Sequence, residues 1–201
     1  MDQLSKLTKN YFKIEKVKAK IAILGAPGSG KSTLSSGLLY FSKLFRFKSD
    51  MVPEVAKWDV YKKVDFRTDK YERSKFKRQK NLEKIYPHEL EITICEAPLI
   101  ISAIYSEYYR GKDDPIAQEM MKNAIKHKDD YTHFFVTRKL VSGFEDFGRN
   151  EDEKASEELH QKTLDILERL RINYTVINKY DDHVPLQILE MIGAVQKNGK
   201  H

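Results

Sequence analysis

One segment, residues 25–33, constrains the fold of this 201-residue chain more than any other. It reads Gly-Ala-Pro-Gly-Ser-Gly-Lys-Ser-Thr, and its first eight residues match the spacing G-x-x-x-x-G-K-[ST]. The apolar residues 21–24 before it predict a buried strand, and residues 31–44 predict a helix. Between a strand and a helix, such glycines let backbone amides converge on phosphate oxygens, and the helix dipole favours negative charge there. The segment therefore predicts a phosphate-binding loop that grips a nucleoside triphosphate.

The side chains of this predicted loop have distinct roles. Lys31 is placed to reach the outer phosphates and Ser32 to ligate Mg²⁺, so we expect ATP and Mg²⁺ as the bound species. Kinases, GTPases and motor ATPases share the motif. Residues 178–181 read Asn-Lys-Tyr-Asp, but they follow the last predicted strand, where GTPases do not keep their guanine reader. The residues assigned to nucleotide binding are Gly25, Ala26, Pro27, Gly28, Ser29, Gly30, Lys31, Ser32 and Thr33.

Short β-rich segments alternate with longer helical segments along the chain. This alternation predicts an α/β fold in which helices cover both faces of a five-stranded parallel sheet, a three-layer arrangement. The predicted strands are residues 20–24, 49–53, 91–95, 132–137 and 172–177. The predicted helices are residues 31–44, 55–62, 71–85, 99–109, 115–126, 152–169 and 185–196.

Composition restricts the class of protein further. The chain has 40% hydrophobic and 33% charged residues, and no run approaches the roughly 20 apolar residues that span a bilayer. We therefore expect a cytoplasmic protein that does not associate with membranes. Cys95 is the single cysteine, which excludes an intrachain disulfide. The net charge of +6 favours anionic partners, nucleic acid among them, although the basic runs at residues 1–20 and 62–84 are better explained as solvated helix faces.

Two glutamates directly follow predicted strands. Ligand groups in such a sheet come from loops at the carboxyl ends of strands, which nominates Glu54 and Glu96. Glu96 is a candidate to hold Mg²⁺ through water or to orient an attacking hydroxyl. Glu54 is a candidate to accept a proton or a hydrogen bond from an acceptor hydroxyl. The alternative for both is an ordinary glutamate at a helix N-terminus.

Two arginines bracket a glycine-containing segment after the fourth predicted strand. Arg138 and Arg149 enclose residues 139–148, which we interpret as a lid. An arginine that closes over a transferring phosphate stabilises developing charge and displaces water, so a lid favours phosphoryl transfer over simple binding. A surface loop with incidental arginines is the alternative. With Lys31, Glu54 and Glu96, these arginines complete the candidate catalytic set.

Taken together, these residues resemble the ribosylnicotinamide kinase domain of bifunctional NAD-salvage proteins and the small P-loop ATPases classed with it. The resemblance rests on residues 25–33, on Glu54 followed three residues later by Lys57, on the aromatic-rich residues 105–111, and on residues 145–149. It implies a five-stranded parallel sheet and transfer of the ATP γ-phosphate to a hydroxyl of a nucleoside-like acceptor. Glu96 stands where that family carries an Asp-containing segment.

The sequence thus predicts an ATP-dependent kinase that acts on a nucleoside-, nucleotide- or ribosylnicotinamide-like acceptor. A kinase acting on hydroxyl groups of modified DNA and a P-loop ATPase that is not a kinase are the alternatives. Residues 1–19 are expected to form a basic N-terminal arm or helix, and residues 20–201 the P-loop kinase domain. The acceptor, the preferred donor base and the oligomeric state are left open.

Overall fold

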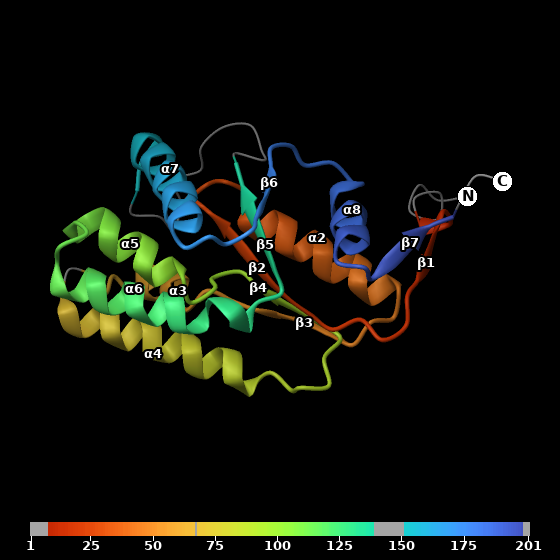
Figure 1. The fold of residues 1–201 in the computed structure, drawn as a ribbon, viewed down its shortest axis with the longest axis horizontal. Coiled ribbons are helices and arrows are strands. Elements are labelled where there is room, and N and C mark those ends of the chain that lie inside the picture. Colours follow the sequence, from red (N-terminus) through yellow and green to blue (C-terminus); the bar gives the residue numbers. More distant parts are fainter. Residues whose placement is uncertain (1–7, 67, 139–150, 199–201) are drawn as a thin grey trace.

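A computed structural model describes residues 8–66, 68–138 and 151–198 of the chain. Five parallel strands form its main sheet, in the order β3-β4-β2-β5-β6, which confirms the predicted sheet. Because β2 lies between β4 and β5, the loop that follows it opens at the middle of the carboxyl edge of the sheet (Figure 1). The strands are β2 Ala19–Gly25, β3 Ser49–Val52, β4 Ile92–Cys95, β5 His133–Thr137 and β6 Thr175–Ile177.

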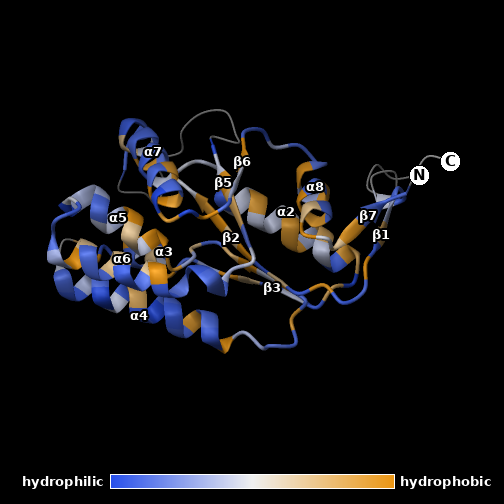
Figure 2. Ribbon diagram, in the orientation of Figure 1, coloured by the Kyte–Doolittle hydropathy of each residue, from blue (hydrophilic) through white to orange (hydrophobic). Residues whose placement is uncertain are grey.

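Helices cover both faces of this sheet, which gives three layers (Figure 1). Successive residues of a strand point to opposite faces. In β2, Ile21 and Ile23 pack in a core shared with α2 and α8, whereas Ala22 and Leu24 pack in a core shared with α4, α5, α6 and α7. The central strand β2 is accordingly largely apolar (Figure 2). The helices are α2 Lys31–Leu44, α3 Val55–Tyr61, α4 Asp69–Ile85, α5 Ile101–Arg110, α6 Pro115–His127, the 3₁₀ helix Lys128–Asp130, α7 Glu153–Arg169 and α8 Val184–Met191.

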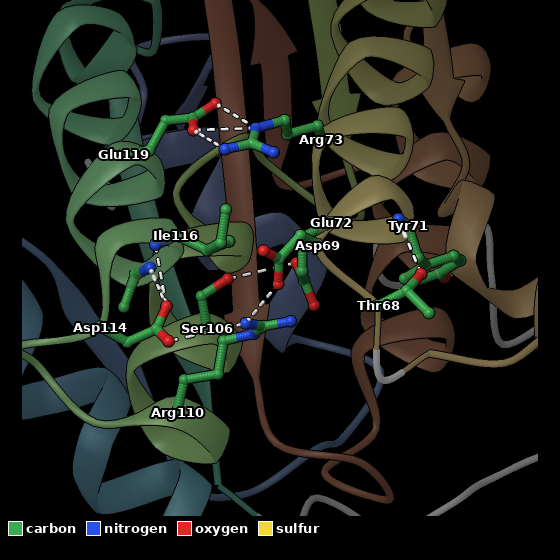
Figure 3. Close-up of polar contacts among 11 residues, drawn as sticks. Thr68, Asp69, Tyr71, Glu72, Arg73, Ser106, Arg110, Asp114, Ile116 and Glu119 are labelled. Carbon is green, nitrogen blue, oxygen red and sulfur yellow. Dashed lines mark hydrogen bonds and ion pairs between the residues drawn. The ribbon is translucent and has the colours of Figure 1, made fainter.

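Side-chain caps fix where three of the helices begin. The Thr68 hydroxyl accepts a hydrogen bond from the Tyr71 amide at 3.1 Å at the start of α4. Asp114 accepts from two amides in the first turn of α6 (Figure 3), and Asp152 accepts from the Ala155 amide in α7. Each cap satisfies amides that have no partner within their own helix.

The end of the chain differs from the prediction. The helix predicted for residues 185–196 is wrong beyond Met191, because Gly193 adopts φ 70° and turns the backbone out of the helix. The residues after it form β7, Val195–Lys197, which pairs antiparallel with β1, Tyr11–Lys13. Part of the segment expected as a basic arm or helix is therefore a strand of a separate two-stranded sheet. Periodicity does not reveal such short strands, since each is only three residues long.

The strand predicted for residues 172–177 is shorter than expected. The Ile172 amide still donates to the Leu167 carbonyl at 3.0 Å, so it closes the end of α7 rather than starting the sheet. Arg171, at φ 54°, makes the left-handed turn out of that helix. The sheet pairing of β6 with β5 consequently begins at Thr175.

Candidate active site

The phosphate-binding loop begins at Gly25, where β2 passes very close to β5. A Cβ atom at Gly25 would lie 2.1 Å from the Thr137 hydroxyl oxygen and 2.9 Å from its carbonyl oxygen, so only glycine fits. At the other end of the loop, Gly30 is the N-cap of α2 with a left-handed φ of 92°. Left-handed backbone favours glycine because a side chain would crowd the carbonyl. The motif glycines are therefore required by the local path of the chain.

Hydrogen bonds from outside the motif hold the loop in place. The hydroxyls of Ser29 and Thr137 lie 2.6 Å apart, and Thr137 also donates to the Leu24 carbonyl at 3.2 Å. From α7, the Ser156 hydroxyl donates to the Pro27 carbonyl at 2.6 Å. Sequence reasoning missed Thr137 and Ser156. Thr137 left a signal, because it is a polar residue at the end of an otherwise apolar buried strand.

Lys31 and Ser32 point their polar atoms at the mouth of this loop. The Lys31 ammonium donates to the carbonyls of Gly25 and Ala26, at 2.9 and 3.3 Å. The Ser32 hydroxyl donates to the carboxylate of the buried Glu96. A hydroxyl beside a carboxylate supplies the hard oxygen ligands that Mg²⁺ prefers, and one or two such ligands plus phosphate oxygens are a usual set for that ion. The residues present therefore fit the expected metal.

Glu54 lies at the carboxyl end of β3, where it is the N-cap residue of α3. Its side chain accepts no hydrogen bond from that helix, and it has no hydrogen-bond or ion-pair partner elsewhere among the described residues. Burial raises the pKa of the Glu54 carboxyl, and the charge of Glu96 raises it further, whereas Lys31 and Lys75 oppose the shift. Lys31 and Glu96 therefore both lie near enough to Glu54 for their charges to act on its carboxyl. The backbones of the two strand ends are also joined, because the Glu96 amide donates to the Val52 carbonyl at 3.1 Å.

Of the two candidate arginines, the structure describes Arg138 but not Arg149. Arg138 follows β5 and borders a cavity of about 740 Å³ between the phosphate-binding loop and the first turns of α7. It is exposed, with its guanidinium 3.5 Å from the Glu157 carboxylate. Arg149 and the predicted lid, residues 139–148, lie outside the described residues. The placement of Arg138 suits a group that reaches a bound triphosphate from the α7 side.

The aromatic residues after Glu54 divide into two kinds. Trp58 and Tyr61 are 50% and 52% exposed, so they are not core residues. Phe66 packs its ring edge-to-face on Tyr71, with the ring centroids 4.9 Å apart. The Tyr71 hydroxyl in turn donates to Asp59 at 3.0 Å. Trp58 and Tyr61 are therefore the rings of this segment that reach the surface.

Helix α4 brings charged groups to the Glu54 side of the site. Lys75 forms an ion pair of 2.9 Å with Glu72, whose carboxylate also accepts from the Ser106 hydroxyl (Figure 3). Arg78 forms a two-point contact with Asp59. No sequence motif nominated these α4 residues. Their helical spacing within a basic run suggested a solvated face, whereas one side of that helix is buried against α3 and α5.

Tyrosines of α5 hold the start of α7 beside the loop. The Tyr109 hydroxyl donates to Glu151 at 2.6 Å, and the Tyr108 hydroxyl donates to Glu158 at 2.7 Å. The hydrogen bond to Glu158 is the main cause that raises the pKa of Tyr108 to about 12, so both phenols stay neutral donors near neutral pH. The aromatic-rich residues 105–111 thus connect α5 to the segment that follows the predicted lid.

A glycine-rich grip between a central parallel strand and a helix, with Lys31, Ser32 and an acid on the neighbouring strand, defines a P-loop nucleotide-binding protein of the α/β class. The chain belongs to the AAA domain family, whose model matches residues 20–183. No sequence among the curated proteins matches it. Across the described parts of the chain, no helix has both the length and the apolar character needed to cross a membrane.

Solved structures of P-loop kinases share the fold. A NadR protein in complex with NAD and AMP-PNP matches with a TM-score of 0.67 at 14% identity, over 92% of this chain and 52% of that protein. This chain therefore spans about half the length of NadR. Thymidylate kinase from Candida albicans matches with a TM-score of 0.58 at 14% identity, over 91% and 99% of the two chains. Deoxyadenosine kinase from M. mycoides with bound dATP matches with a TM-score of 0.57 at 17% identity, over 88% and 100%. The fold is thus that of P-loop kinases, as the sequence resemblance implied.

Proposed function

We propose that this protein is an ATP-dependent phosphotransferase that moves the γ-phosphate of ATP to a hydroxyl of a nucleoside-like small molecule. One observation carries the proposal. Lys31 and Ser32 at the start of α2 lie beside Glu96 and Glu54, which follow adjacent strands: Ser32 donates to Glu96, and the charges of Lys31 and Glu96 act on the Glu54 carboxylate, which has no hydrogen-bond or ion-pair partner among the described residues. A largely buried carboxylate without a partner among the described residues costs folding free energy, and a protein that only binds nucleotide has no need of such a group.

The donor side of the site consists of the loop, Lys31 and Arg138. Lys31 donates to loop carbonyls, and the negatively charged phosphates of a bound nucleotide would offer its ammonium stronger acceptors. Arg138 borders the cavity above the loop and is exposed, so it is free to turn from Glu157 to a phosphate. ATP as the donor is supported by the AMP-PNP in the NadR structure and the dATP in the deoxyadenosine kinase structure.

Mg²⁺ would be held by Ser32, with Glu96 contacting its water ligands. When bound, the ion neutralises charge on the β- and γ-phosphates. Glu96 is buried, and the hydrogen bond that it accepts from Ser32 fixes the orientation of that hydroxyl.

Glu54 would act on the acceptor. An acceptor hydroxyl gives its proton to the Glu54 carboxylate while its oxygen bonds to the γ-phosphorus. The bond between that phosphorus and the bridging oxygen breaks, and its electron pair leaves with ADP. The raised pKa makes Glu54 a better proton acceptor than an exposed glutamate, because burial disfavours its charged form.

The charges near Glu54 support an acceptor without a phosphate group. Among the described residues of α4, Lys75 is paired with Glu72 and Arg78 with Asp59, so their charges are already compensated. A phosphorylated acceptor would require uncompensated cations, usually arginines in a two-point contact. The exposed rings of Trp58 and Tyr61, on the helix that Glu54 begins, offer flat apolar surface for a base.

A transfer screen tests the proposal. The full chain would be incubated with γ-labelled ATP, Mg²⁺ and, in separate reactions, nucleosides, mononucleotides, ribosylnicotinamide and single- or double-stranded DNA that contains hydroxymethylated pyrimidines. We expect a labelled product with a nucleoside-like acceptor only. Labelled DNA would show that the acceptor is the polymer and not a small molecule. ATP hydrolysis without any labelled acceptor would favour an ATPase that is not a kinase.

A further inference from the structure

The turn that carries Glu54 is held by a residue with no assigned role. Gln79 lies in α4 and is only 4% exposed. Its side-chain oxygen accepts a hydrogen bond from the Val55 amide at 3.0 Å, and its side-chain nitrogen donates to the Pro53 carbonyl at 3.1 Å. Val55 and Pro53 are the two neighbours of Glu54 in the sequence. One side chain from another helix therefore fixes the backbone on both sides of Glu54.

At the start of α3, the side-chain hydrogen bond to the helix comes from Gln79 and not from Glu54. The first amides of a helix have no partner within it, and an N-cap carboxylate commonly accepts from them. Glu54 occupies the N-cap position of α3 without making that bond. Gln79 satisfies the Val55 amide, and no described residue donates a hydrogen bond to the Glu54 carboxylate.

The position of Gln79 on α4 strengthens the connection. Lys75 lies four residues earlier, so the two side chains share a face of the helix. The charge of Lys75 acts on Glu54, which places that face against the Glu54 turn. At the same edge of the sheet, the Glu96 amide bonds to the Val52 carbonyl. The path from β3 into α3 is thus fixed from α4 and from β4.

We propose that Gln79 is a positioning residue that aims the Glu54 carboxylate at the acceptor by clamping the backbone on both sides of it. This inference rests on the proposed function of Glu54 as the group that meets the acceptor hydroxyl. Displacement of a catalytic group by about 1 Å costs on the order of 10²-fold in rate, so a clamp of this kind has measurable value.

Steady-state kinetics of two variants form the first test. Gln79→Leu keeps the approximate size of the side chain and removes both hydrogen bonds, and we expect kcat for transfer to fall about 10-fold to 100-fold with the KM for ATP unchanged. Gln79→Glu reproduces the donor and the acceptor only when its carboxyl is protonated, so we expect the ratio of its kcat to the parental kcat, measured at each pH, to rise as the pH is lowered. A kcat within about twofold of the parent for Gln79→Leu would overturn the proposal.

Phe76→Leu is the matched control. Phe76 lies one turn earlier on α4, in the core that faces α5 and α6, and makes no hydrogen bond to the Glu54 turn. Phe76→Leu should lower the melting temperature without changing the kcat for transfer or the KM for ATP. If Phe76→Leu and Gln79→Leu lose kcat equally at matched loss of stability, Gln79 is only a packing residue.

A double variant separates failure of this inference from failure of the proposed function. If Gln79 acts through Glu54, adding Gln79→Leu to Glu54→Gln costs no further rate, whereas independent effects would multiply and overturn the inference. Carbon NMR of glutamate-labelled protein gives a readout that needs no activity. The titration midpoint of Glu54, identified by its loss in Glu54→Gln, should move in Gln79→Leu and not in Phe76→Leu. An unmoved midpoint overturns the positioning role even if no acceptor is ever phosphorylated.

Discussion

At the scale of single residues, the carboxylate of Glu54 stands apart from the other acids near the loop. Glu96 accepts from Ser32, and Glu72 is paired with Lys75, whereas Glu54 has no such partner in the described part of the chain. A group that is kept largely buried and uncompensated lowers stability, and such groups concentrate at functional sites.

Substitution of Glu54 should therefore separate activity from stability. We expect Glu54→Gln to reduce transfer by about 10²-fold to 10⁴-fold, because the amide keeps the shape and loses basicity. ATP affinity should stay at the parental value. Glu89→Gln, an exposed change on the same type of residue, is the control. Near-parental transfer by Glu54→Gln would show that another group meets the acceptor.

The raised pKa of Glu54 gives a prediction for stability in the nucleotide-free protein. A carboxyl whose pKa is higher in the folded chain than in the unfolded chain binds its proton more readily when folded. The folded state consequently loses stability as the pH rises from the unfolded pKa through the folded one. Above that window, Glu54→Gln should melt at a higher temperature than the parent, and at pH 4 the difference should shrink. A lower melting temperature for the variant at pH 7 would contradict this.

Substitution of Lys31 tests whether residues 25–33 bind the phosphates of ATP. Lys31→Ala should reduce ATP turnover by on the order of 10²-fold or more, since it removes a cation from the transferring phosphates. The fold should persist, because among the described residues the Lys31 ammonium donates to two loop carbonyls and to no core side chain. Lys43→Ala, an exposed change on the same helix, is the control for helix stability. Parental ATP consumption by Lys31→Ala would show that the loop is not the active grip.

Substitution of Glu96 tests whether this residue helps to hold Mg²⁺. Glu96→Gln should raise the Mg²⁺ concentration at half-maximal rate about 10-fold to 100-fold, the range for partners that orient metal ligands. Excess EDTA should abolish transfer in the parent. Glu54→Gln is the informative comparison, because it should leave the Mg²⁺ titration in place while it lowers the rate. Unchanged Mg²⁺ dependence in Glu96→Gln would move the metal role to another residue.

At the scale of elements, the loop between β2 and α2 depends on neighbours that are distant in sequence. The Thr137 hydroxyl of β5 contacts Ser29 of the loop, and the Ser156 hydroxyl of α7 donates to the Pro27 carbonyl. The close approach of β5 is also the reason why Gly25 accepts no side chain.

Two glycine substitutions test that account. Gly25→Ala places a Cβ within 2.1 Å of the Thr137 hydroxyl oxygen, so we expect loss of stability above about 1 kcal/mol and much weaker ATP binding. Gly193→Ala, with a similar need for positive φ but open space around the site, should cost about 1 kcal/mol and leave ATP affinity unchanged. Thermal melts and nucleotide titrations of the two variants give both quantities. Equal ATP affinity in the two would contradict the proximity argument.

At the scale of the whole molecule, the net charge of +6 bears on the kind of acceptor. A polymer that engages six to ten phosphates would lose about 10³-fold to 10⁵-fold in affinity between 50 and 200 mM salt. We expect the KM for the acceptor to change by less than about threefold over that range, because a small acceptor without phosphates makes no such contacts. A steep salt dependence of acceptor binding would instead indicate that the acceptor is a nucleic acid and that the basic runs at residues 1–20 and 62–84 contact its phosphates.

Local signals predicted most of the elements. The P-loop spacing, the apolar runs of the strands and the helical periodicity are properties of short segments, and they identified α2 with the bounds Lys31–Leu44 and the five parallel strands. The same position-by-position reasoning nominated Glu54 and Glu96, since both directly follow strands whose carboxyl ends share an edge.

The sequence by itself determined the phosphate grip, the α/β class and the two acids at the strand ends, because each is specified by residues within a few positions of one another. Only the tertiary structure decided which partners those residues have. Gln79 clamps the Glu54 turn from a helix 24 positions away, and Ser156 reaches Pro27 across 129 positions. The pairing of β1 with β7 joins the two ends of the described chain. Such contacts depend on how separate elements pack, and the periodicity of a single segment does not specify which other segments will lie against it.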